Sequence, residues 1–216
     1  MKVKKLLEYG GLAAGVVLFV FGIVAIVMAF NGRSTVNSSL KNEYIVGTPD
    51  MTPAAIKAEA TKAKLDLSKI QLPTCTVANK AISSGADARC FAKYMRIHTF
   101  EATGGQTYAQ MGRFLTAAGK PTNDAKAAAI DPKTKQPVEN GLRNLWVTET
   151  ALTTALNVSY LASQIALFSI VVGVALVLSG IGFVILALVA LGNAFRRDQK
   201  LAAAPATIRD ASPTPA

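Results

Sequence analysis

The sequence predicts an all-α fold: an antiparallel transmembrane helix hairpin with an inserted extracytoplasmic helical domain that carries one disulfide. Two apolar runs, residues 9–30 and 165–192, predict the arms of the hairpin, because about 20 apolar residues cross the hydrocarbon core of a bilayer as a helix. The segment between them, residues 31–164, is polar and long enough to fold around its own core. It shows no sustained strand alternation, so we expect helices there as well.

The charges that flank the apolar runs predict their orientation. Basic residues lie at both outer ends: Lys2, Lys4 and Lys5 before the first run, and Arg196, Arg197 and Lys200 after the second. Since cytoplasmic flanks are enriched in Lys and Arg, residues 1–8 and 193–216 are predicted to be cytoplasmic, the latter as a disordered tail. A signal peptide cleaved near Val27-Met28-Ala29 is the alternative for the N-terminus, but the run exceeds the usual 7–15 apolar residues and favours an uncleaved anchor.

Small residues recur at seven-residue intervals in both runs, which places each set on one helix face. The first set is Gly15, Gly22 and Ala29, and the second is Ala166, Gly173, Gly180 and Ala187. Helices in lipid approach each other closely through small residues, so we expect the two faces to pack together. Gly11, four residues before Gly15, adds a second small surface for another subunit or a partner protein.

The central segment is expected to contain several helices. The spacing of Val36, Leu40 and Tyr44 favours continuation of the first helix beyond the membrane, unless Asn31-Gly32 interrupts it. Capping and stop signals predict further helices, followed by an exposed loop over residues 118–140. The predicted helices are residues 53–64, 77–82, 87–102 and 107–116, with a long stalk helix from about residue 141 through the second span.

The two cysteines, Cys75 and Cys90, predict one structural disulfide. Both lie in the segment placed outside the cytoplasm, where disulfides persist. Metal binding and redox catalysis have little support, because there is no CxxC motif and His98 is the one histidine.

Three stretches carry a resemblance to a known group. They are Val46-Gly-Thr-Pro-Asp-Met-Thr-Pro-Ala-Ala-Ile56, the run from Cys90 through His98 to Gly105, and Leu145-Trp-Val-Thr-Glu-Thr-Ala151. With the flanking spans, they resemble actinobacterial two-span membrane proteins of unknown function, often labelled "aromatic ring-opening dioxygenase". The resemblance implies the plasma membrane of an actinobacterium, with the central domain facing the cell wall. Extradiol enzymes hold iron with two His and a carboxylate, and a single His98 cannot supply that set.

Candidate chemistry is sparse elsewhere. The chain lacks GxSxG, P-loop, GxGxxG and HExxH motifs, so no catalytic residue, cofactor or metal ligand is expected. His98 is interpreted as a packing or surface residue. The net charge of +10 indicates a solvated surface or attraction to anionic lipid or wall polymers. The scattered basic residues argue against nucleic acid.

These observations lead to two function hypotheses. The first is a non-enzymatic accessory or scaffold subunit of a cell-envelope complex, with lipid and other envelope proteins as partners. The alternative is a cell-envelope enzyme or lipid-binding module with a site in the extracytoplasmic domain. Trp146 is interpreted as packing against the domain, with an exposed partner contact as the alternative. An exposed apolar patch near Trp146 would favour the first hypothesis, and a pocket lined by His98 and nearby acids would favour the second.

Overall fold

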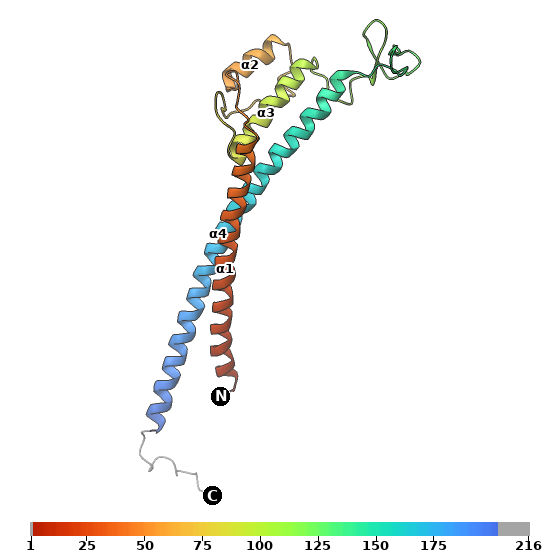
Figure 1. The fold of residues 1–216 in the computed structure, drawn as a ribbon. Helices are drawn as coiled ribbons and strands as arrows, with labels where there is room; N and C mark the ends of the chain where they lie inside the picture. The colour runs from red at the N-terminus through yellow and green to blue at the C-terminus, as the bar shows by residue number, and fades with distance from the viewer. Residues whose placement is uncertain (1, 203–216) are drawn as a thin grey trace. The chain divides into compact units, whose positions relative to one another are not determined.

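The computed structural model describes residues 2–202, and its fold is mostly helical (Figure 1). A minimal antiparallel sheet pairs β1 (Phe114–Leu115) with β2 (Pro121–Thr122), with Phe114 opposite Thr122. The elements in chain order are α1 (Lys2–Asn42), α2 (Pro53–Lys62), α3 (Gly85–Ala102), β1 (Phe114–Leu115), β2 (Pro121–Thr122) and α4 (Gly141–Ala202).

The chain divides into two compact units. Within the described part of the chain, the first contains residues 2–30 and 167–202, and the second contains residues 31–166. The helices α1 and α4 each contribute to both units, and each is long and apolar enough to cross a membrane. Asn31-Gly32 does not interrupt α1, which continues to Asn42.

The first unit exposes large apolar side chains and buries small ones. Phe21, Met28, Phe168 and Leu186 are each about two-thirds exposed, at 65–68%. A soluble protein rarely shows a continuous apolar surface of this kind. The arrangement therefore suits an apolar surrounding.

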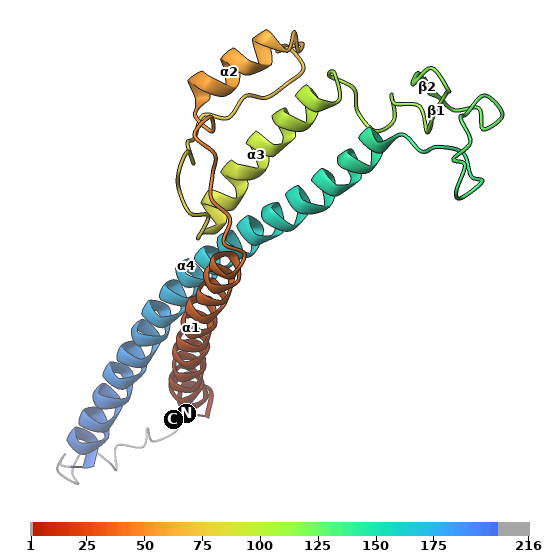
Figure 2. The ribbon, with the colours of Figure 1, turned by 45° about the horizontal axis from the view of Figure 1, so that its top comes forward.

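The core of the second unit lies between α2, α3 and the segment that links them, closed by α4 (Figure 2). Ile56 from α2, Val77 and Ile82 from the linking segment, and Tyr94 from α3 are at most 1% exposed. Leu156 completes this cluster from α4. Burial of these side chains is the main source of stability for the unit.

The start of α2 confirms the sequence prediction. Thr52 has an extended backbone, and its hydroxyl accepts a hydrogen bond from the Ala55 amide at 3.2 Å. Pro53 takes the first helical position, where its missing amide costs nothing.

Polar contacts around Asp87 fix the start of α3. The Ser84 hydroxyl accepts from the Asp87 amide at 3.2 Å and donates to its carboxylate at 2.7 Å. Lys80 also donates to this carboxylate. Burial raises the pKa of Asp87, but the hydrogen bonds from Lys80 and Ser84 outweigh it and leave the pKa below its ordinary value. Asp87 is therefore an ionised part of the helix cap.

Three predicted features of the chain differ from the structure. Residues 77–82 form no helix: Asn79 turns the chain at φ 56°, and Ala78 and Ala81 bridge to Gly47 and Val46. Residues 107–116 form turns and β1, because their backbone pairs with β2 and with Glu139. These long-range partners override local helix signals.

The predicted loop over residues 118–140 is mostly exposed, as expected. Backbone pairing orders it, since it contains β2 and a bridge between Ile130 and Pro137. Residues 193–202 continue α4, where a disordered tail was predicted. The remainder of that predicted tail lies outside the described residues.

Candidate functional site

Within the first unit, the glycines of α1 and α4 lie against each other's backbone. A Cβ added to Gly15 would lie 2.9 Å from the carbonyl oxygen of Gly180, and one on Gly22 would lie 2.7 Å from that of Gly173. Gly15 faces Gly180 and Gly22 faces Gly173, so residue numbers increase along α1 while those of their partners on α4 decrease. The two helices therefore run antiparallel here. Side chains at these positions would displace a backbone rather than a flexible group.

Other small residues lie along the same faces. A Cβ on Gly11 would lie 3.9 Å from the Cβ of Ala187, an ordinary contact distance. Ala29 and Ala187 are 4% and 6% exposed. Ala166 is also buried, at 7% exposed, but it belongs to the second unit. Contact of Gly11 with a further subunit stays a prediction.

The disulfide Cys75–Cys90 is present, as predicted, with Cα atoms 6.1 Å apart. It joins the segment after α2 to the first turns of α3. The Tyr94 hydroxyl donates to the Cys75 carbonyl at 2.6 Å, and burial raises the pKa of Tyr94. The hydrogen bond from the neutral Tyr94 phenol thus joins the same two segments as the disulfide, α3 and the segment after α2.

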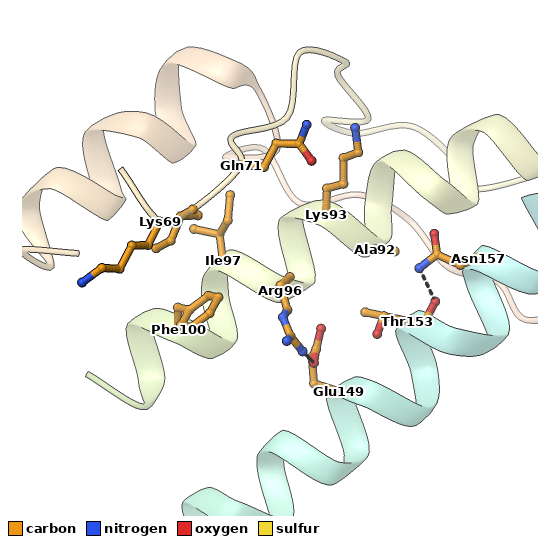
Figure 3. Close-up of a pocket in the computed structure, with 11 residues that line it drawn as sticks. Lys69, Gln71, Ala92, Lys93, Arg96, Ile97, Phe100, Glu149, Thr153 and Asn157 are labelled. Carbon is orange, nitrogen blue, oxygen red and sulfur yellow. Dashed lines mark hydrogen bonds and ion pairs between the residues drawn. The ribbon is translucent and has the colours of Figure 1, made fainter. Parts of the chain in front are cut away.

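A groove of about 430 Å³ lies between α3, α4 and residues 69–71 of the second unit (Figure 3). Its floor contains an ion pair: Arg96 Nη1 lies 2.8 Å from Glu149 Oε2. The Glu149 side chain is 2% exposed, and its Oε1 atom has no hydrogen-bond partner in the described part of the chain. Burying a charged carboxylate without a paired cation destabilises the fold. The ion pair with Arg96 therefore offsets the desolvation of Glu149.

Aromatic rings hold the Arg96 guanidinium in place. Its Cζ atom lies 4.2 Å from the centre of the Trp146 ring, and Trp146 packs edge-on against Phe100 at 5.1 Å. Trp146 is only 5% exposed. The interpretation that Trp146 packs against the domain is therefore confirmed, and its alternative, an exposed partner contact, does not fit this burial.

The groove carries an excess of positive charge. Lys69, Lys93 and Arg96 line it, with Glu149 as the acid among its lining residues. Lys69 is engaged by Asp66 at 2.9 Å. Hydrogen bonds from Ser68 and Lys69 lower the pKa of Asp66 to about 2. Lys93 and the exposed edge of Arg96 could attract an anionic group.

His98 lies in a separate cluster with three acids. Its Nε2 atom is 3.1 Å from Asp50 Oδ2, and its Nδ1 atom is 3.2 Å from Glu101 Oε2. Glu59 on α2 also lies close, so that Asp50, Glu59 and His98 each offer a donor atom within 4.8 Å of the others. The His98 side chain is 31% exposed, which fits the predicted packing or surface residue. The groove does not include it.

An apolar stripe follows the face of α4 that points away from the core of the second unit. Its residues alternate by four and three positions, the spacing of a coiled-coil seam. Val147, Val158, Leu161 and Ile165 are 53–57% exposed. The full stripe is Val147, Ala151, Thr154, Val158, Leu161 and Ile165, in which Thr154 is the one polar side chain.

Comparisons of the chain with protein-family models, with curated proteins and with solved structures found no match.

The sequence analysis missed the groove and the His98 cluster. One readable signal was Glu149, the single charged residue between Arg143 and Arg196. An isolated acid in a long apolar helix points to a buried partner. A second signal was Glu101, one helical turn after His98 on the same face.

Proposed function

We propose that this chain is a non-enzymatic plasma-membrane protein with two spans, serving as an accessory or scaffold subunit of a cell-envelope complex. Both termini would be cytoplasmic, and the second unit would face outward. The apolar surface of the first unit supports insertion, and the disulfide supports an oxidising compartment for the second. The resemblance to actinobacterial two-span proteins supports the plasma membrane as the location.

The apolar stripe on α4 is the observation that carries the subunit role. It begins at Val147, well before the proposed second span at residue 165, so lipid would not cover most of it. Water-exposed helices normally place charged residues on the outward face, yet this face has none between Val147 and Ile165. A four-three spacing of apolar residues suits a helix from another chain.

Protease accessibility tests the proposed topology. Trypsin added to spheroplasts is expected to cut near Lys133, which is exposed in the second unit, while tags at both termini stay intact. Trypsin after permeabilisation serves as the control and should remove both tags. Loss of a terminal tag with the loop at Lys133 uncut would contradict the orientation.

Site-specific photo-crosslinking in native membranes tests the subunit role. A benzophenone side chain at Val158 lies on the apolar stripe, whereas one at Asn157 lines the groove on another side of the same turn. We expect a protein adduct from Val158 and from Leu161, and none from Asn157. Mass spectrometry then identifies the partner. Protein adducts from neither stripe position would overturn the subunit proposal.

The groove favours a second candidate function, an anionic-ligand or lipid-binding module. Its positive lining and the apolar side chains of Ile97 and Phe100 suit a molecule with a charged head and an apolar part. In the same experiment this candidate predicts the reverse pattern. A lipid or small-molecule adduct would form at Asn157 and not at Val158.

A further inference from the structure

The cluster around His98 has the composition and convergence of a metal site. Asp50 comes from the loop before α2, Glu59 from the middle of α2, and His98 and Glu101 from the last turns of α3. The donor atoms of Asp50, Glu59 and His98 lie within 4.8 Å of one another. Ligands 2.0–2.2 Å from a common ion lie about 3–4 Å apart. Small side-chain rotations would therefore bring all three donor atoms onto one ion, with water in a fourth position.

The two nitrogens of His98 face two acceptors. A neutral imidazole has one N–H group and can donate to only one of Asp50 and Glu101. If Nδ1–H donates to Glu101, the lone pair of Nε2 points at the Asp50 carboxylate. The lone pair and the carboxylate repel each other. A cation between them would remove this repulsion, because both groups would coordinate it.

Glu101 occupies the position of an orienting group behind a metal-binding histidine. Histidine ligands usually donate their other ring nitrogen to a carboxylate, which fixes the ring and raises its basicity. Glu101 Oε2 lies 3.2 Å from Nδ1 of His98. The other carboxylate oxygen of Glu101, Oε1, is buried and has no hydrogen-bond partner in residues 2–202.

The charge balance of the cluster also favours a cation. Three carboxylates lie around one histidine, and no Lys or Arg among the described residues forms an ion pair with any of them. Asp50 and Glu101 pair with His98. This local acidity contrasts with a chain of net charge +10. A divalent ion would neutralise two of the three negative charges.

We propose that Asp50, Glu59 and His98 bind a divalent transition-metal ion such as Zn²⁺, with Glu101 orienting His98. The nitrogen donor favours Zn²⁺ over Ca²⁺ and Mg²⁺, which prefer oxygen ligands alone. The ion joins the loop before α2, α2 and α3. This site lies apart from the groove and from the α4 stripe, so it stands independently of the proposed function.

Isothermal titration of the full-length protein in detergent tests the site. The protein is purified without a polyhistidine tag, stripped with EDTA and titrated with ZnCl₂ at pH 7.5. We expect one equivalent of Zn²⁺ to bind, with a dissociation constant on the order of 1 µM or tighter. CaCl₂ is expected to give no comparable heat.

Matched variants decide whether the cluster is responsible. His98→Gln and Asp50→Asn are expected to abolish binding, and Glu101→Gln to weaken it about tenfold. Asp66→Asn removes an exposed carboxylate elsewhere in the same unit and should bind like the parent. Trp146 fluorescence checks that each variant is folded. Absence of Zn²⁺ binding by the parent, or equal binding by folded His98→Gln and Asp50→Asn, would overturn the proposal.

Discussion

Gly180→Leu is expected to force α1 and α4 apart within the first unit. A Cβ at Gly180 would already lie 2.6 Å from the Gly15 carbonyl oxygen and 2.7 Å from the Phe19 amide nitrogen. Because both are backbone atoms, no side-chain rotation relieves the clash. Overpacking of this kind costs about 1–3 kcal/mol, and a leucine against two backbone atoms belongs at the upper end.

An engineered disulfide measures this separation. Cysteines at Gly11 and Ala187 would have Cβ atoms about 3.9 Å apart, within the range that disulfides require. We expect Gly11→Cys/Ala187→Cys to crosslink readily under mild oxidation. Gly10→Cys/Ala187→Cys is the matched control, since a Cβ at Gly10 contacts nothing within 4 Å.

Adding Gly180→Leu to the crosslinking pair is expected to reduce its yield about tenfold or more, in line with the overpacking cost. Leu178→Ile should leave the yield unchanged, because Leu178 is 64% exposed and lies off the contact face. Equal yields in the leucine and isoleucine variants would refute close packing through the glycines.

Removal of the disulfide is expected to have the largest effect on the second unit. Cys75→Ala/Cys90→Ala opens a covalent loop with a sequence separation of 15 residues, which is worth about 3 kcal/mol of unfolding free energy in the chain-entropy model. The melting temperature of the unit should fall by roughly 10 °C.

The fluorescence of Trp146 reports this loss directly. Trp146 is the one tryptophan of the chain, and it is buried in the second unit. The unchanged chain with a reducing agent added is the control and should melt like the double variant. A shift below about 1 kcal/mol in both would mean that the packing around Tyr94 holds the segment without the covalent link.

Local signals predicted the elements whose ends are fixed by neighbouring residues. Thr52-Pro53 marked the start of α2, and Gly104-Gly105 marked the end of α3, where both glycines adopt positive φ. The long apolar runs marked α1 and α4. In each case the deciding physics, a cap or a helical period, acts over a few residues.

Elsewhere, local sequence signals gave wrong predictions because residues distant in the sequence pair with each other. The predicted helix over residues 77–82 is a turn held by bridges to Val46 and Gly47, more than 30 positions earlier. Arg96 and Glu149 meet across 53 residues. The cluster around His98 draws on three segments, and no spacing rule connects Asp50 with His98.

The contribution of α4 to both units has a consequence for biosynthesis. Ribosomes release α1, α2 and α3 first, yet Gly173 and Gly180 in one unit and Leu156 and Glu149 in the other arrive only with the last helix. Neither unit can close while residues 141–202 are still unsynthesised. Until then, Arg96 and the glycine face of α1 lack their partners. A premature stop codon before residue 141 would therefore leave degradation-prone fragments instead of a shortened functional protein.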